Sequence, residues 1–212
     1  MSVITLDSFI RLGGDPDDPL AVRWLRPRLD PGVQPFVIDQ LLPVGSTFGL
    51  TRFLKQRKLL GVAKGRLTEV YYHLSADPDV RFHALGWQNE AGGWVLQNPR
   101  WYGLLGGKAI TVIPGDPVRV AVFEHYLDYL KWLMLFRSPT HTVIVLNSTD
   151  FLDAGVFLCR FFREAELFYH SERLLKRIHS RYGHYTDYSV DNAVLNEGYA
   201  DYIAAWRSRP NC

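Results

Sequence analysis

Three short apolar runs separated by helical segments constrain the fold of this chain more than any other feature of its sequence. The runs lie at residues 118–123, 142–146 and 165–169, and residues 126–135 between the first two carry apolar side chains at helical spacing. Apolar runs that are buried on both faces and joined by helices are typical of a parallel sheet with crossover connections. The pattern therefore predicts an α/β fold.

Polar residues follow each of these runs. Glu124 follows the first run, Asn147 the second, and His170 and Glu172 the third. Ligands of open α/β sheets bind at the carboxyl ends of the parallel strands, so we expect these four side chains to lie along one edge. Asp128 lies one helical turn after Glu124 and could reach the same edge.

The residues around the first two strand ends resemble a known family. Residues 123–130 and 143–148 are similar to the toprim domain of bacterial primases and of mobilisation proteins of mobile elements. Residues 86–98 and 108–113 are similar to the segment that precedes toprim in that group, and the resemblance extends in order over residues 54–206. It implies a toprim-like, Rossmann-type parallel sheet with flanking helices. It also implies a primase-related protein of a mobile element that takes part in DNA replication and binds DNA or RNA, with single strands favoured.

The chain departs from the family pattern at the residues that bind metal. Family members have a glutamate followed by glycine after the first strand and an Asp-x-Asp pair after the third. Here Glu124 is followed by His125, and the pair is replaced by His170 and Glu172. Magnesium prefers compact oxygen ligands, whereas imidazole suits transition metals.

The departures leave two forms of the site open. We favour a degenerate, non-catalytic site that holds no cofactor. The alternative is an active phosphoryl-transfer enzyme of primase or nuclease type, in which Mg or Mn is bound by Glu124, His170, Glu172 and Asp128, with Glu124 and Glu172 as catalytic residues.

Three parts are expected along the chain. Residues 1–45 contain six prolines and read as an irregular, Pro-rich N-terminal arm. Residues 46–113 read as a small α+β unit with antiparallel strands, and residues 114–212 as the toprim-like α/β domain. The arm could contact a protein partner, so a protein-interaction adaptor without nucleic-acid binding is a further alternative.

The small α+β unit has local patterns of its own. A helix is predicted from Ser46 or Thr47 through Arg57, and alternation of apolar residues predicts strands at 67–74, 81–88 and 93–97. The last two strands are expected to form a hairpin through residues 89–92.

Nucleic-acid contacts must come from a local patch, because the net charge of the whole chain is only +2. Basic and aromatic residues close together can contact phosphates and stack on bases. The helix around Lys55, Arg57 and Lys58 has a basic face, for which a solvated surface is the commoner role. The candidate nucleic-acid-binding residues are Arg100, Trp101, Lys108, Arg173, Lys176 and Arg177.

Composition and the absence of other motifs narrow the remaining classes. The two cysteines, Cys159 and Cys212, exclude a disulfide framework and a four-cysteine zinc site. The histidines lack the spacing of a helical zinc site, and no serine lies in a nucleophile elbow. The sequence shows no signal peptide and no membrane span, so we expect a cytoplasmic protein that does not bind membranes.

Overall fold

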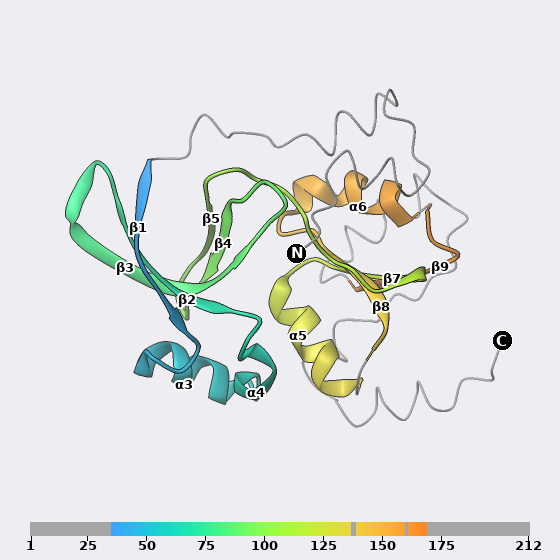
Figure 1. The fold of residues 1–212 in the computed structure, drawn as a ribbon, viewed down its shortest axis with the longest axis horizontal. Coiled ribbons are helices and arrows are strands. Elements are labelled where there is room, and N and C mark those ends of the chain that lie inside the picture. The colour runs from blue at the N-terminus through green and yellow to red at the C-terminus, as the bar shows by residue number, and fades with distance from the viewer. Residues whose placement is uncertain (1–34, 137–138, 160, 169–212) are drawn as a thin grey trace. The chain divides into compact units, whose positions relative to one another are not determined.

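The computed structural model describes residues 35–136, 139–159 and 161–168 (Figure 1). The chain divides into two compact units, with the boundary between Val112 and Ile113. Each unit has its own sheet and is described by itself below. No helix in the described part of the chain is long and apolar enough to cross a membrane.

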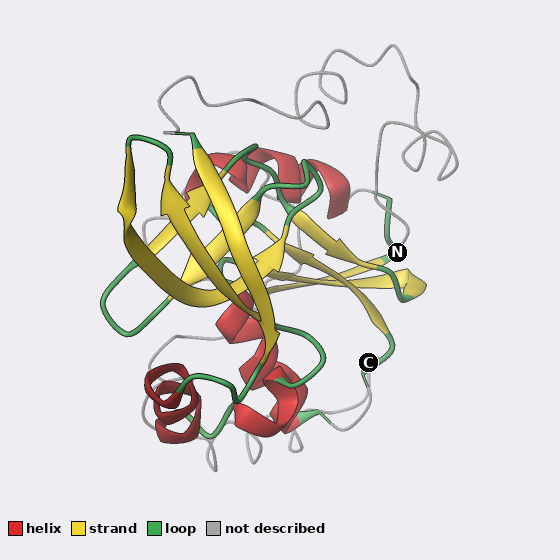
Figure 2. Ribbon diagram, turned by 60° about the vertical axis from the view of Figure 1, so that its left-hand side comes forward, coloured by secondary structure: helices red, strands yellow, loops and turns green. Residues whose placement is uncertain are grey.

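The first unit is built on a five-stranded antiparallel sheet. Its strands are β1 (Phe36–Pro43), β2 (Thr68–Leu74), β3 (Asp77–Gln88), β4 (Trp94–Gln97) and β5 (Tyr102–Leu105). Strand order follows chain order, so each strand pairs with the next along the chain. Helices α3 (Phe48–Gln56) and α4 (Leu60–Ala63) lie between β1 and β2. Figure 2 shows the strong curvature of these strands.

Alternating side chains give the sheet an apolar face. The buried cluster on this face consists of Val70, Tyr72, Ala84, Leu96 and Leu105, with Phe36, Ile38 and Trp94 packed against it. Burial of one large apolar side chain contributes about 1.5–3 kcal/mol, so a cluster of this size is a major source of stability. The cluster is one part of the core of the first unit, to which buried side chains such as Leu50, Leu54 and Leu85 also belong.

The second unit is built on a four-stranded mixed sheet with the order β6-β8-β7-β9. Strand β6 (Thr111–Ile113) lies at the junction of the two units, and β7 (Asp116–Phe123), β8 (His141–Val145) and β9 (Glu164–Phe168) follow. Helix α5 (Tyr126–Leu135) connects β7 to β8. The short helix η1 (Thr149–Phe151) and helix α6 (Leu152–Cys159) connect β8 to β9. Figures 1 and 2 show α5 and α6 on opposite faces of this sheet.

Strand β7 pairs in parallel with both β8 and β9. Val122 lies opposite Ile144 on one side and Leu167 on the other. The ring of Phe123 stacks on that of Phe168, with centroids 4.6 Å apart, and the Trp132 ring of α5 lies 5.4 Å from the Phe123 ring. These contacts fix the carboxyl ends of β7 and β9 side by side and tie α5 to them.

The prediction of a Rossmann-type parallel α/β fold is wrong. The larger sheet is wholly antiparallel, and the smaller one is mixed rather than parallel. The parallel sheet was predicted for residues 114–212, and only a small antiparallel unit was predicted for residues 46–113. Residues 36–105 instead contain enough alternating segments for a sheet of five strands, which sets the fold class.

Several local predictions are confirmed. The predicted strands at 118–123, 142–146 and 165–169 overlap the parallel strands β7, β8 and β9, each of which begins one or two residues earlier. The predicted helix is α3, and the predicted antiparallel strands are β2, β3 and β4. Residues 36–43 belong to the segment expected to be irregular, yet they form β1.

Candidate functional site

The carboxyl ends of β7 and β8 bring Glu124 and Asn147 together, as expected from the sequence. The main-chain amide of Asn147 donates to the main-chain carbonyl of Glu124 at 3.1 Å. The main-chain amide of Glu124 donates to the carbonyl of Phe168 at 3.3 Å. Asn147 adopts a left-handed φ of 63°, which asparagine tolerates better than most residues. Both side chains are buried. The main chain therefore links the ends of all three parallel strands.

Asp128 lies on the first turn of α5, one turn after Glu124, and its side chain is also buried. Its carboxylate accepts from Lys131 Nζ at 3.0 Å, so the charge of Asp128 is balanced within the helix. His125 Nε2 lies 3.7 Å from Glu124 Oε1. The strand end thus holds two buried carboxylates, each next to a basic group.

The metal hypothesis needs more ligands than these. Within residues 35–136, 139–159 and 161–168, no three His, Cys, Asp or Glu side chains are grouped so that they could hold a metal ion. His170 and Glu172, the two other predicted ligands, lie outside the described residues. Two carboxylates, one of them ion-paired to lysine, do not make the oxygen shell that magnesium requires. The metal site stays a prediction.

Among the candidate nucleic-acid-binding residues, Arg100 and Trp101 lie on the turn between β4 and β5. The Asn98 Oδ1 atom accepts from both of their amides at 2.9 Å, and the Trp101 side chain is 41% exposed. Lys108 is half-buried. Arg173, Lys176 and Arg177 lie outside the described residues.

The glycines near Lys108 have a structural role in the described unit. Asn89 Nδ2 donates to the Gly107 carbonyl at 2.7 Å, and Asn89 Oδ1 accepts from the Gly93 amide at 3.0 Å. A Cβ atom on Gly93 would lie 2.1 Å from the Gly107 oxygen. These glycines allow two turns to pack against each other.

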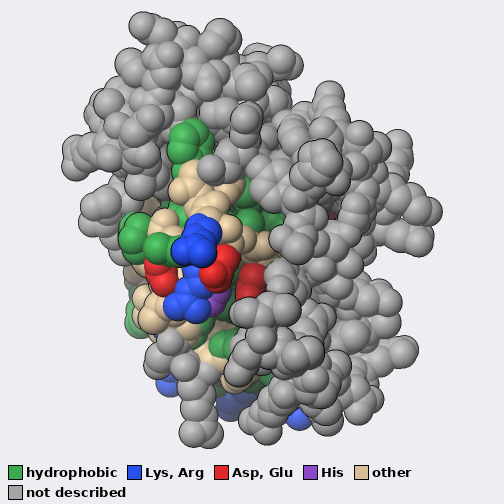
Figure 3. Space-filling model, turned by 90° about the vertical axis from the view of Figure 1, so that its right-hand side faces the viewer, with side chains coloured by type: hydrophobic (Ala, Val, Ile, Leu, Met, Phe, Trp, Pro, Cys, Tyr) green, Lys and Arg blue, Asp and Glu red, His purple; other side chains and the backbone are tan. Residues whose placement is uncertain are grey.

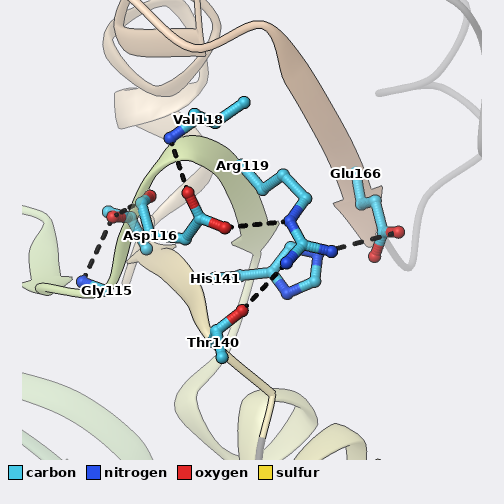
Figure 4. A network of polar contacts seen from close by, with 8 residues as sticks. Gly115, Asp116, Val118, Arg119, Thr140, His141 and Glu166 are labelled. Carbon is cyan, nitrogen blue, oxygen red and sulfur yellow. Dashed lines mark hydrogen bonds and ion pairs between the residues drawn. The ribbon is translucent and has the colours of Figure 1, made fainter.

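A second polar cluster lies at the amino-terminal end of β7 (Figure 4). Asp116 accepts from the Val118 amide at 2.8 Å and from Arg119 Nε at 3.0 Å, and Arg119 also donates to Thr140 Oγ1 at 3.0 Å. The Val118 amide, and then the Arg119 guanidinium, hold the pKa of Asp116 below its ordinary value. The cluster fixes the start of the strand.

His141 begins β8 beside this cluster, and its Nε2 lies 4.0 Å from Glu166 Oε1. Partial burial is the main reason that the pKa of His141 lies below its ordinary value, and the positive charge of Arg119 lowers it further. The carboxylates of Asp116 and Glu164 oppose the shift. Figure 3 shows acidic, basic and histidine side chains side by side on the described surface. Charges of both signs neutralise one another there.

The segment from α3 to the start of β2, which also contains α4, has the opposite arrangement and carries charge of one sign. Six exposed basic side chains and no acidic residue occur between Val44 and Thr68. We call this set the basic helical surface. Its members are Arg52, Lys55, Arg57, Lys58, Lys64 and Arg66.

Local packing holds these helices in place. Leu50, Phe53 and Leu54 are buried on one side of α3, which directs the remaining side of the helix to solvent. Arg57 lies over the Phe53 ring, with its guanidinium carbon 3.9 Å from the ring centroid. Arg66 donates to the Val62 carbonyl at 3.1 Å. Within the described residues, none of the six forms an ion pair with a carboxylate.

The turn before α3 is held by a buried glutamate. Glu69 on β2 is 0% exposed and accepts from the Gly45 amide at 2.8 Å and from the Thr47 hydroxyl. The Thr47 hydroxyl also contacts the Tyr71 hydroxyl. Gly45 has a φ of 113°, a conformation that favours glycine. The sequence offered the basic residues as a signal, but not this turn, because its hydrogen-bond partners lie 22 or 24 residues apart along the chain.

Cys159 offers no reactive thiol. It is buried in α6, and burial raises the pKa of its thiol to about 12. The thiolate is the nucleophilic form, so this cysteine is a packing residue.

Comparison with known proteins gives a partial match. Residues 39–106 match the model of a family described as a domain of unknown function (DUF8464), which covers about a third of the chain. This segment contains most of the first sheet together with α3 and α4, so the basic helical surface lies within it. Neither the curated proteins nor the solved structures contain a significant match.

Proposed function

We propose that this protein binds nucleic acid through the basic helical surface. The observation that carries the proposal is the concentration of charge: six of the 24 lysines and arginines of the chain lie within residues 44–68, without one acidic residue. Phosphate contacts from lysine and arginine supply most of the affinity of non-specific nucleic-acid binding. A surface of one sign is what such contacts need.

The lack of ion pairs between these six side chains and described carboxylates supports the same function. Among the described residues the six basic groups form no ion pair, so no carboxylate of these residues has to be displaced when a phosphate binds. The amino-terminal end of β7 differs in this respect, since Arg119 is already bound by Asp116. The two surfaces therefore differ in what they can offer to a polyanion.

The buried side of α3 makes the surface a fixed one. Leu50 and Leu54 are almost completely buried, so the helix cannot rotate without loss of core packing. Arg57 is further restrained by its contact with Phe53. Side chains that are positioned in the free protein lose less conformational freedom on binding.

The sequence resemblance supports the same class of ligand. Primases and mobilisation proteins act on nucleic acids, and residues 86–98 and 123–130 resemble theirs. We accordingly propose a nucleic-acid-associated protein of a mobile element, with the binding function assigned to the basic helical surface rather than to a metal centre.

The salt dependence of binding tests this proposal. Fluorescence anisotropy with a labelled oligonucleotide at salt concentrations from about 50 to 200 mM gives the slope of log K against log salt. Six phosphate contacts with a single strand predict a slope of about −4. The triple variant Arg52→Glu/Lys55→Glu/Lys58→Glu loses three of these contacts, so we expect its slope to be about −2 and its binding to be weaker than that of wild type.

A control variant tests whether a charge reversal elsewhere on the protein has the same effect. Arg163 is exposed in the second unit, so Arg163→Glu alters the charge of the protein at a position outside the basic helical surface. We expect Arg163→Glu to keep the wild-type slope. Absence of binding at the lowest salt concentration, or a wild-type slope in the triple variant, would overturn the proposal.

A further inference from the structure

Phe48 is the most exposed of the large hydrophobic side chains in the described part of the chain. It is the first residue of α3, and 82% of its surface is open to solvent. A single exposed hydrophobic residue is common on protein surfaces, so its neighbours decide what it can do.

The neighbours of Phe48 on α3 are cations. Residues four and seven positions further along a helix lie on the same face, and these positions hold Arg52 and Lys55. The apolar residues of the helix, Leu50 and Phe53 among them, face the core instead. The helical rise places Arg52 about 6 Å and Lys55 about 10 Å along the axis from Phe48. The aromatic ring thus stands at one end of a row of positive charges.

Hydrogen bonds to the buried Glu69 side chain hold the turn that precedes Phe48. Glu69 accepts from both the Gly45 amide and the Thr47 hydroxyl, so two of the three residues before the helix are held by a buried carboxylate. The Thr47 side chain consequently does not cap α3, although threonine is a common capping residue. The network presents the Phe48 ring to solvent at a defined place.

We propose that Phe48 is a stacking site for an unpaired base, and that the nucleic acid bound by this protein is therefore single-stranded. This inference rests on the proposed function and adds the form of the ligand. An unpaired base offers an exposed π-face to an aromatic ring, while Arg52 and Lys55 contact the phosphates next to it. In a duplex the bases are stacked on one another and do not reach such a ring without being unstacked.

A protein partner fits this arrangement less well. Aromatic anchors of protein interfaces lie at the centre of well-packed patches from which water is excluded. Phe48 is instead followed along its helix face by two solvated cations. An isolated ring in a row of positive charge matches the alternation of base and phosphate along a single strand.

Binding of a single-stranded oligothymidine and of a duplex of equal length, measured at one salt concentration, tests the inference. We expect wild type to favour the single strand, and Phe48→Ala to weaken single-strand binding about tenfold while duplex binding and the salt slope stay unchanged. Phe48→Trp should restore the affinity, whereas Phe48→Leu should not, because leucine is apolar but has no flat π-face.

An abasic oligonucleotide isolates the contribution of the base. Wild type and Phe48→Ala should bind it equally, since it retains the phosphates and lacks the stacking partner. Recovery by Phe48→Leu, or equal binding of single strand and duplex by wild type, would overturn the stacking site and leave nucleic-acid binding in place. Absence of binding to every oligonucleotide would overturn the proposed function and the stacking site with it.

Discussion

At the scale of single residues, Glu69 shows how a buried charge can shape a surface that it does not reach. The carboxylate is fully buried on β2 and binds the main chain and side chain of the turn before α3. Hydrogen bonds to a charged group are stronger than those between neutral groups, and the loss of one partner leaves the other unsatisfied. The position of Phe48 therefore depends on a residue beneath it.

We expect Glu69→Ala to destabilise the protein by about 2 kcal/mol, because it leaves the Gly45 amide and the Thr47 hydroxyl without their acceptor. Chemical denaturation gives the free energy of unfolding. Asp77→Ala, an exposed change on β3, is the matched control and should alter stability by less than about 0.5 kcal/mol. A Glu69→Ala variant as stable as this control would show that the network does not hold the turn.

His141 makes stability depend on pH. Its folded pKa lies below the ordinary value of 6.5, chiefly because the side chain is partly buried, so the unfolded state binds more protons just below pH 6.5. Stability should consequently fall as the pH decreases from 6.5 towards the lowered pKa. The difference in unfolding free energy between wild type and His141→Gln should therefore become smaller as the pH decreases through this range.

Denaturation at a series of pH values between about 7 and 5 measures this effect. His141→Asn should give the same pH dependence as His141→Gln, since neither replacement titrates, even if their stabilities differ. A wild-type advantage that is constant across the window would contradict the assignment to His141.

Some site residues could be predicted from the sequence and others could not. Glu124 and Asn147 follow directly after apolar runs, so strand ends placed them together correctly. Phe48 and Phe53 belong to the same helix, and helical spacing alone assigns Phe53 to the buried side. The turn that precedes Phe48 is held by Glu69, whose distance along the chain leaves no local pattern.

At the scale of elements, the turns of the first unit are packed backbone against backbone. Asn89 binds both turns through its side chain, and Gly93 lies against the Gly107 carbonyl. The sequence predicted the hairpin of β3 and β4 from its asparagine and glycines, but not the contact with the later turn. Such a contact depends on the curvature of the sheet.

Gly93→Ala should strongly destabilise the protein, because the added Cβ would lie 2.1 Å from the Gly107 oxygen and the backbone would have to move. We expect a loss of about 1–3 kcal/mol, measured by thermal or chemical denaturation. Gly49→Ala is the matched control: Gly49 lies in α3 with no atom within 4 Å of its added Cβ. That change should stabilise the helix by about 0.5–1 kcal/mol. Equal effects of the two changes would contradict the close packing at Gly93.

Strand β1 shows why an element can be missed. Pro35 precedes it and Pro43 is its last residue, and prolines argue against a strand within a sheet. The strand lies at the edge of the sheet order and has a register shift between Ile38 and Gln40. Edge strands tolerate both features, but the sequence does not say which strand lies at an edge.

At the scale of the whole molecule, the fold class could not be extended from one part of the chain to the other. The apolar runs predicted the parallel strands of the second unit correctly. The first unit contains the larger sheet, whose five strands are all antiparallel. Period-two segments predict strands, yet they do not predict how many strands join in one sheet.

The net charge of the whole chain, like its fold class, does not describe each of its parts. The net charge of +2 argues for no particular partner, whereas residues 44–68 carry six positive charges and no negative one. A property averaged over 212 residues hides a surface built from a short segment. The inference about nucleic acid therefore concerns residues 44–68 of the first unit.

The position of β7 in the sheet order has a consequence for biosynthesis. β7 pairs with β8 on one side and β9 on the other, and β9 ends 45 residues after β7. Strand β7 is synthesised before both of its neighbours, so its amides and carbonyls lack their final partners until β8 and β9 have been made. We therefore expect this strand order to favour self-association of incomplete chains during translation, and rapid completion of the chain to reduce it.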